Sequence, residues 1–258
     1  MAETDHSGPP RLSAAESGDG QAVLVLLHGF GGCNAVWDDL RTAFSAKMKV
    51  IAYDMPGHGG SLAFGNLSPK AAARALLDDL AVRGVEKAHL VGHSMGGAVA
   101  ILAACLQPER IASLTLLAPG GIGPEINGDV LRVFAAARSA EEISDALAAM
   151  SGPAASPAPD VAAAIAATRR LAGQTATLTT LASAISDKNR QGAFPPEMLA
   201  GIACPVSVAW GREDPVLPFA QTARLPAGAR LVALDNAGHM LIEEAPAAVA
   251  ALIASTLS

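Results

Sequence analysis

Six short runs of branched apolar residues, separated by longer stretches with helical periodicity, constrain the fold of this chain most strongly. The runs are apolar almost throughout, which is typical of strands buried on both faces, as in a parallel sheet covered by helices. Strands that alternate with helices in this way indicate an α/β architecture. The six predicted strands are residues 22–27, 50–53, 89–91, 114–118, 206–210 and 230–234.

Several of the intervening helices have recognisable ends. Ser68 and Pro69 place a capping hydroxyl before a proline at the first helical position, and the helix that follows is expected to cover residues 70–83 and stop at a glycine. Residues 95–106 are expected to be helical because the next proline ends the stretch. Residues 243–258 are expected to form a final alanine-rich helix.

More than eighty residues between the fourth and fifth predicted strands contain no convincing strand. A loop of that length is unusual inside a compact domain, so we expect helices there. Residues 139–142 match a capping box that opens a helix to about Met150, and Asp160 is a candidate cap for a helix ending at Gly173. Residues 152–159 are expected to be a flexible connector. The predicted division is a core of residues 1–121 and 201–258 with a helical cap insertion of residues 122–200.

Composition limits the classes of partner. The chain has 258 residues, of which 51% are hydrophobic, and its formal net charge is −6 without a basic block. These values favour a protein with a substantial core and disfavour nucleic acid or an anionic membrane as its main partner. The three cysteines are widely spaced, and the first twenty residues contain no signal-like apolar stretch. We therefore expect a cytoplasmic protein with reduced thiols, either a monomer or a homodimer.

A Gly-X-Ser-X-Gly pattern centred on Ser94 lies directly after the third predicted strand and before a predicted helix. A sharp strand-to-helix turn of this kind holds a serine in a strained conformation with its hydroxyl projecting above the sheet. Gly92 and Gly96 would flank the serine because side chains there would collide across the turn. This context favours Ser94 as a nucleophile over a chance occurrence of the pattern.

Two backbone amides are predicted to stabilise an oxyanion in front of this serine. The amide of Met95 begins the helix and benefits from the positive end of the helix dipole. The glycine-rich loop His28–Gly32 follows the first predicted strand and would bring the amide of Phe30 inward. A dinucleotide-binding loop is the alternative, but the loop lacks the GxGxxG spacing. We expect His28 itself to be a structural hydrogen-bonding residue.

The predicted base and acid both follow strands near the end of the chain. His239 lies just past the last predicted strand and Asp214 just past the one before it. A serine needs a neutral imidazole to take its proton, and the imidazole needs a carboxylate to fix its tautomer. Glu213 and Asp235 are the competing acids, with Glu213 expected to point away and Asp235 to serve a local turn. The predicted catalytic residues are thus Ser94, Asp214 and His239, with no metal and no cofactor.

These segments resemble the α/β-hydrolase superfamily along nearly the whole chain. The matching pieces are HGFGG at 28–32, DMPGHGGS at 54–61, GHSMGG at 92–97, WGREDPVLP at 210–218 and AGHM at 237–240. The resemblance implies the α/β-hydrolase fold, a mostly parallel central sheet flanked by helices, and the chain order serine, acid, histidine. Relatives that cleave carbon–halogen bonds or epoxides carry aspartate where this chain has Ser94. Because the region before residue 22 is short, one leading strand of the usual sheet is expected to be absent.

Within this superfamily, one segment of the chain resembles a particular group of proteins. Residues 117–128, LAPGGIGPEING, look like the hydrolase-like domain fused to some acetoin dehydrogenase acyltransferase subunits. Those subunits carry a lipoyl domain ahead of this region, and we expect this chain to differ from them in that respect. The motifs are equally similar to those of carboxylesterases and enol-lactonases.

The leading hypothesis is a serine carboxylesterase that cleaves an ester of a small or medium apolar acyl group through an acyl-serine intermediate. Ile122, Val216 and Met240 are expected to line the substrate pocket beside Phe30 and Met95. His93 is expected to pack, and Cys33 to be a buried, inert thiol. Two alternatives stay open: hydrolysis of a lactone or a carbon–carbon bond with the same catalytic parts, and a non-catalytic module of an acyltransferase complex.

Overall fold

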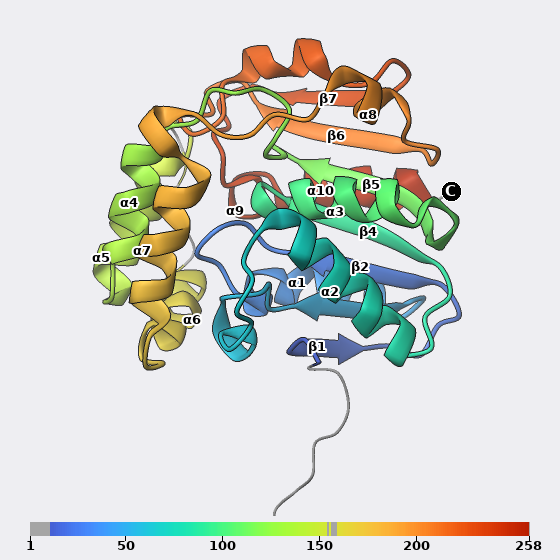
Figure 1. The fold of residues 1–258 in the computed structure, drawn as a ribbon, viewed down its shortest axis with the longest axis horizontal. Helices are drawn as coiled ribbons and strands as arrows, with labels where there is room; N and C mark the ends of the chain where they lie inside the picture. Colours follow the sequence, from blue (N-terminus) through green and yellow to red (C-terminus); the bar gives the residue numbers. More distant parts are fainter. Residues whose placement is uncertain (1–10, 154, 156–158, 258) are drawn as a thin grey trace, which may run out of the picture.

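A seven-stranded sheet forms the centre of the computed structural model, which describes residues 11–153, 155 and 159–257 (Figure 1). The strand order is β1-β3-β2-β4-β5-β6-β7. All neighbouring pairs are parallel except β1 with β3, so the sheet is mostly parallel, as predicted. The strands are β1 Ala14–Ser17, β2 Val23–Leu27, β3 Lys49–Tyr53, β4 Ala88–His93, β5 Ile111–Leu117, β6 Val206–Gly211 and β7 Arg230–Leu234.

Strand β1 is the one strand that the sequence did not predict. Its four residues, AAES, have neither an apolar run nor an apolar-polar alternation, because β1 is an edge strand that is only partly buried. Backbone pairing with β3 defines it, together with an ion pair of 3.0 Å between Lys49 Nζ and a Glu16 carboxyl oxygen. The segment before β2 therefore does contribute a strand to the sheet.

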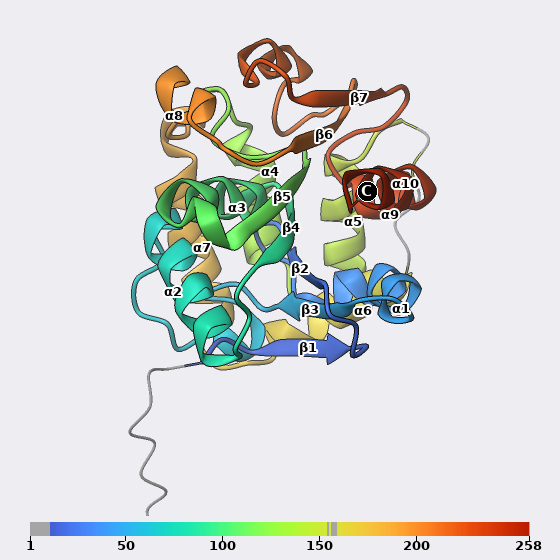
Figure 2. The same cartoon turned by 90° about the vertical axis from the view of Figure 1, so that its right-hand side faces the viewer.

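Helices cover both faces of the sheet. Helices α2 and α3 lie on one face, whereas α1, α9 and α10 lie on the other (Figure 2). The central strands are mainly apolar, and every residue of β2 is buried. Burying one leucine or valine side chain contributes roughly 1.5–3 kcal/mol, so the central strands supply much of the stability. These helices are α1 Asp38–Ser45, α2 Pro69–Val82, α3 Met95–Leu106, α9 Leu241–Glu244 and α10 Pro246–Leu257.

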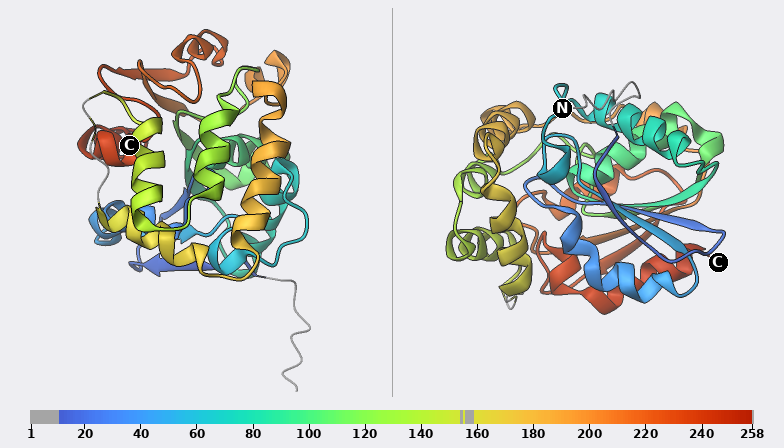
Figure 3. Two further views of the ribbon diagram at one scale, coloured as in Figure 1. Left: turned by 90° about the vertical axis from the view of Figure 1, so that its left-hand side faces the viewer. Right: turned by 90° about the horizontal axis from the view of Figure 1, so that it is seen from below.

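Four further helices stand at the carboxyl ends of the parallel strands (Figure 3, left). Helices α4 to α7 come from the segment that was predicted to form a cap, and the short helix α8 leads back to the sheet. The four helices are α4 Gly128–Ala136, α5 Ala140–Met150, α6 Pro159–Arg169 and α7 Gln174–Ile185, and α8 covers Pro196–Ala200.

The sequence predicted the ends of some helices correctly and those of others wrongly. The capping box of Ser139 with Glu142 is present at the start of α5. Gly173, predicted to end a helix, instead precedes α7 with a φ of 86°. The predicted C-terminal helix is two helices separated at Ala245, which has an extended φ of −141°. Within the predicted connector, residues 154 and 156–158 lie outside the described residues.

In the described part of the chain, no helix combines the length and the apolar character needed to span a bilayer.

Candidate active site

Ser94 lies at the sharp turn between β4 and α3, as the sequence predicted. Its φ of 51° and ψ of −115° fall outside the regions that side chains other than glycine favour. Holding such a conformation costs roughly 1–3 kcal/mol, which the surrounding structure must offset. A Cβ on Gly92 would lie 2.5 Å from the Gly96 carbonyl oxygen, and one on Gly96 would lie 2.3 Å from the carbonyl oxygen of Leu27. The turn therefore requires glycine at both flanking positions.

Asp214 and His239 meet at the ends of β6 and β7. His239 Nδ1 donates to Asp214 Oδ2 over 2.8 Å, and both side chains are buried. The other carboxylate oxygen, Oδ1, accepts from the backbone amides of Val216 and Leu217, each at 2.8 Å. Because these three donors fix the carboxylate, the imidazole is held with its proton on Nδ1 and Nε2 free to act as a base.

The two competing acids lie elsewhere. Glu213 is exposed, and its backbone amide donates to the Ala237 carbonyl oxygen. Asp235 is an exposed partner of Arg212, with 2.7 Å between the guanidinium Nε and a carboxylate oxygen. Asp214 is thus the carboxylate that reaches His239.

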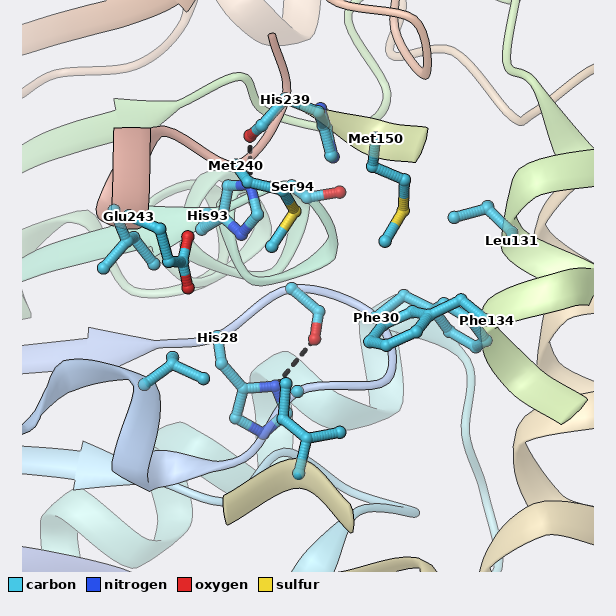
Figure 4. Close-up of a pocket in the computed structure, with 15 residues that line it drawn as sticks. His28, Phe30, His93, Ser94, Leu131, Phe134, Met150, His239, Met240 and Glu243 are labelled. Carbon is cyan, nitrogen blue, oxygen red and sulfur yellow. Dashed lines mark hydrogen bonds between the residues drawn. The ribbon is translucent and has the colours of Figure 1, made fainter. Parts of the chain in front are cut away.

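Ser94 and His239 line the same small cavity (Figure 4). The Ser94 hydroxyl makes no hydrogen bond to any residue that the structure describes, so it is not yet bonded to the imidazole. Hydrogen bonds of this kind are commonly long in unliganded enzymes and tighten when substrate binds. The arrangement is therefore compatible with a serine nucleophile and a histidine base.

The amides of Phe30 and Met95 are both free donors beside Ser94. Neither donates a hydrogen bond to a described residue, and the amide of Met95 is at the first position of α3, where helices leave donors unpaired. Phe30 lines both cavities that reach Ser94, and Met95 lines the larger one. Both residues thus line a cavity beside Ser94, and their role as oxyanion donors stays a prediction.

Two buried histidines hold the loop that carries Phe30. His28 Nε2 accepts from the Met55 amide at 3.0 Å, so its Nδ1 carries the proton that is donated to the Gly29 carbonyl oxygen at 2.7 Å. His58 Nε2 likewise accepts from the Gly31 amide at 3.0 Å. Burial lowers the pKa of His28 to about 4 and that of His58 to about 3, so both rings are neutral. The structural role predicted for His28 is confirmed, whereas that of His58 was not predicted.

Asp54 ties the following segment to the same loop. One carboxylate oxygen accepts from the Asn34 amide at 2.8 Å, and the other accepts from the Gly60 amide at 2.9 Å and the Ser13 hydroxyl at 3.1 Å. The DMPGHGGS motif that contains Asp54 was recognisable in the sequence, but this role was not.

Cys33 beside the loop is buried, and burial raises the pKa of its thiol to about 11, which agrees with the predicted inert thiol.

Two further contacts hold the loop that carries His239. His93 Nε2 donates to the His239 carbonyl oxygen over 2.8 Å (Figure 4), and burial lowers the pKa of His93 to about 3. Glu244 bridges three amides, accepting from Gly152 at 2.7 Å and from Gly238 and Met240 at 2.8 Å each. His93 packs, as predicted, but the contribution of Glu244 was not visible in the sequence.

A larger cavity of about 410 Å³ adjoins Ser94 and has mainly apolar walls. Helices α3, α4 and α7 contribute to it, together with the segment from Gln191 to Phe194. Of the three residues predicted to line a substrate pocket, Met240 lines the smaller cavity. Ile122 and Val216 line neither, because both side chains turn into the core, and their neighbours Gly121 and Leu217 face the larger cavity instead.

A comparison with protein families identifies the superfamily. The model of the alpha/beta hydrolase family matches residues 24–252, which includes the sheet from β2 onward, the cap helices and all three candidate catalytic residues. The chain belongs to the alpha/beta hydrolase family.

Among curated relatives, this chain is similar to a dihydrolipoyllysine-residue acetyltransferase component of an acetoin cleaving system from Pseudomonas putida. The two are 39% identical over 232 residues, which cover 88% of this chain and 61% of the relative. The chain thus spans about three fifths of that relative's length.

Solved structures of other hydrolases share the fold. A meta-cleavage product hydrolase from Pseudomonas fluorescens matches 95% of this chain and 93% of its own with a TM-score of 0.81 and 21% identity. A carboxylesterase from Bacillus subtilis matches 95% of this chain and 86% of its own with a TM-score of 0.78 and 24% identity. At these identities the likeness establishes the fold alone.

Proposed function

We propose that this alpha/beta hydrolase cleaves carboxylic esters through an acyl-Ser94 intermediate, with His239 as base and Asp214 as the acid that orients it. The observation that carries the proposal is the buried hydrogen bond of 2.8 Å between Asp214 and His239, next to a serine on a strained turn. The strained serine and the free amides of Phe30 and Met95 supply the other parts that acyl transfer needs.

In the proposed reaction, His239 Nε2 takes the proton of the Ser94 hydroxyl as the serine oxygen attacks the ester carbonyl carbon. Negative charge develops on the carbonyl oxygen, where the amides of Phe30 and Met95 stabilise it. Removing one such donor typically costs about 10²–10³ in rate. The alcohol leaves with the proton from His239, and water then hydrolyses the acyl-serine by the same steps in reverse.

The larger cavity supports an apolar acyl group. A volume of about 410 Å³ lies within the range for small-molecule sites, and the cavity reaches from Ser94 to the cap helices. Each buried methylene contributes about 0.8 kcal/mol, or roughly a fourfold gain in kcat/KM. We therefore expect kcat/KM to rise with acyl length until the cavity is filled and to fall beyond that length.

The test is hydrolysis of p-nitrophenyl esters with acyl chains of two to twelve carbons. We expect Ser94→Ala to abolish release of p-nitrophenol, while Ser183→Ala, an exposed serine on α7, retains it. Equal activity in the Ser94→Ala variant would contradict the assignment of the nucleophile. A chain-length profile with an internal maximum would support the acyl cavity.

The relative from the acetoin system favours a second candidate, a module that docks in an acyltransferase complex. Its 39% identity over most of this chain is the supporting observation, and the hydrogen bond between Asp214 and His239 counts against a purely non-catalytic role. Hydrolysis of lactones or carbon–carbon bonds would use the same residues. Absence of ester hydrolysis in the unaltered protein would shift the assignment to these alternatives, which lactone substrates and co-purification with a dehydrogenase complex distinguish.

A further inference from the structure

Arg169 is a buried cation that the proposed reaction leaves without a role. It is the last residue of α6, and its neighbour Arg170 is exposed. Among the residues that the structure describes, no carboxylate forms an ion pair with its guanidinium group. Burial lowers the pKa of Arg169 to about 10, so the group still carries its charge at neutral pH. A buried charge without an opposite charge is costly, and other contacts must compensate for it.

Backbone carbonyl groups surround this guanidinium group in place of a carboxylate. Nε donates to the Ala137 carbonyl oxygen over 3.3 Å, and Nη2 donates to the Gly31 carbonyl oxygen over 2.9 Å. Ala137 is the C-cap of α4, so the positive charge also lies at the negative end of that helix dipole. Nη1 donates to the Thr168 hydroxyl over 3.3 Å. Arg169 therefore joins two cap helices to the glycine-rich loop that carries Phe30.

Gly31 and Phe30 are the two central residues of one tight turn in this loop. The Gly32 amide donates to the Gly29 carbonyl oxygen over 3.2 Å, which closes the turn. Gly31 has a φ of 73°, and a turn with a positive φ at this position favours glycine. A Cβ on Gly31 would lie 2.5 Å from the ring of Phe134. The direction of the Phe30 amide is thus part of the conformation of a closely packed turn.

Gly31 is held through both of its backbone groups. Its amide donates to His58 Nε2 over 3.0 Å, and its carbonyl oxygen accepts from Arg169. Burial is the main cause of the low pKa of His58, and the charge of Arg169 lowers this pKa further. The cation therefore helps to keep His58 neutral, with Nε2 able to accept the Gly31 amide.

The ring of Phe134 lies between the cation and the same turn. The central carbon of the Arg169 guanidinium group is 5.3 Å from the centroid of the Phe134 ring, within reach of a cation–π contact. Phe134 in turn packs against Phe30, with 6.3 Å between the ring centroids (Figure 4). Arg169 itself lines neither cavity beside Ser94. Any effect on the reaction must consequently pass through the turn.

We propose that Arg169 is a positioning residue that holds the Phe30 amide in the direction in which it stabilises the oxyanion on the substrate. The inference rests on the proposed esterase function. The Phe30 amide donates to no described residue, so its direction depends on the turn alone. Because the guanidinium group fixes the Gly31 carbonyl group, the turn cannot rotate away from Ser94. The benefit is largest in the transition state, when the oxyanion has formed.

The shape of the side chain matters as well as its charge. A planar guanidinium group can donate to the carbonyl oxygens of Ala137 and Gly31 at the same time. The single ammonium group of a lysine keeps the charge but cannot reproduce this fixed arrangement of donors. A methionine of similar length has neither the charge nor a donor. The two substitutions should therefore impair the reaction to different degrees.

The experiment compares Arg169→Met and Arg169→Lys with the unaltered protein in hydrolysis of a p-nitrophenyl ester. In Arg169→Met we expect kcat to fall by about 10–100-fold with little change in KM, since a misplacement of about 1 Å can cost about 100-fold. Arg169→Lys should give an intermediate kcat. Arg170→Met at the adjacent exposed arginine is the matched control and should retain the unaltered kcat. Circular dichroism shows which variants are folded.

Inhibitor affinity separates positioning from a general loss of structure. When an alkyl trifluoromethyl ketone binds, Ser94 Oγ bonds to the ketone carbon, the hydroxyl proton passes to His239, and the ketone oxygen becomes an oxyanion. The matching methyl ketone resembles the uncharged substrate. In Arg169→Met we expect affinity for the trifluoromethyl ketone to fall by the same factor as kcat/KM, and affinity for the methyl ketone to change little.

An equal loss of affinity for both ketones would show that Arg169 has only a structural role and would overturn the proposal. So would an unchanged kcat in folded Arg169→Met. If Arg169→Met does not fold, Arg169→Lys decides: kcat and trifluoromethyl ketone affinity must fall together, and unaltered values overturn the proposal. An unaltered protein that neither hydrolyses the ester nor binds the trifluoromethyl ketone would contradict the esterase function itself. Hydrolysis that depends on Ser94 but not on Arg169 would overturn this inference alone.

Discussion

The histidines around Ser94 differ in what each ring nitrogen contacts. His28 and His58 accept backbone amides on Nε2, and His93 donates to a backbone carbonyl oxygen. Among the described histidines, His239 is the one paired with a carboxylate. A carboxylate on Nδ1 stabilises the imidazolium that forms when Nε2 takes a proton, whereas backbone partners on buried rings favour the neutral form. This difference in partners supports the proposal that His239 is the base and that the other three histidines are structural residues.

Replacing the carboxylate of Asp214 tests this argument. In Asp214→Asn, the amide oxygen can still accept the two backbone amides, but the side chain no longer stabilises a charged imidazole or fixes its tautomer. We expect the fold to persist and kcat to fall by about 10⁴-fold, as is typical for such a substitution in a triad. Kinetics on the best p-nitrophenyl ester and circular dichroism provide the measurements. Asp235→Asn is the control, and a loss below tenfold in Asp214→Asn would refute the assigned role.

At the scale of elements, a single side chain joins the cap to the loop that carries His239. Glu244 at the end of α9 accepts from the amide of Gly152, just after α5, and from the amides on either side of His239. The His239 amide also donates to the Met150 carbonyl oxygen over 2.9 Å. A Cβ on Gly152 would lie 2.4 Å from the Asn236 carbonyl oxygen, so the two segments are in close contact. The position of His239 thus depends on contacts with the end of α5 and the residues that follow it.

We predict that Glu244→Gln disturbs this junction. The NH2 group of glutamine cannot accept hydrogen bonds, so at least one of the three backbone amides loses its partner. A hydrogen bond to a charged group contributes about 1.5–3 kcal/mol, and the melting temperature should fall by several degrees. Because the lost contact positions His239 and not the acyl group, kcat should fall by about tenfold or more while KM changes little. Glu141→Gln at an exposed position of α5 is the control. An unchanged kcat would argue against coupling between cap and base.

The sequence predicted the elements whose signals are local. Six strands could be predicted because their apolar runs are typical of strands buried on both faces. The start of α5 could be predicted because Ser139 and Glu142 match a capping box. The pairing of Asp214 with His239 also agrees with the structure, although their catalytic roles stay predictions. The orientation of Ile122 was wrong by one residue, since nothing local specifies which side chain in a glycine-rich loop faces a cavity. The burial of the Glu243 carboxyl group and the contacts of Glu244 depend on segments distant in sequence and could not be read from spacing.

At the scale of the whole molecule, buried titratable groups should lower the stability of the fold both at acid pH and at alkaline pH. Burial lowers the pKa of His28 to about 4 and those of His58 and His93 to about 3. Between these values and the ordinary pKa of 6.5, the unfolded chain binds up to three protons that the native state excludes. Stability therefore falls as the pH drops below about 6.5, by up to about 4 kcal/mol per pH unit. A domain with 5–15 kcal/mol of stability would unfold within a few pH units.

Glu243 acts in the opposite direction at higher pH. Its pKa is raised from 4.5 to about 8, so the native state binds a proton that the unfolded chain releases, and stability falls as the pH rises through this window. Below about pH 6.5 the effect of the three histidines on the free energy of unfolding is larger than that of Glu243. Above about pH 6.5 the histidines no longer change the stability with pH, and the effect of Glu243 is left. We therefore predict maximal stability near pH 6.5, measured by urea unfolding at pH 5, 6.5 and 8.5. Glu243→Gln should lose the decline between pH 6.5 and 8.5 and keep the acid decline. Stability that still rises up to pH 8.5 in the unaltered protein would show that Glu243 is ionised, and hence solvated, in the native state.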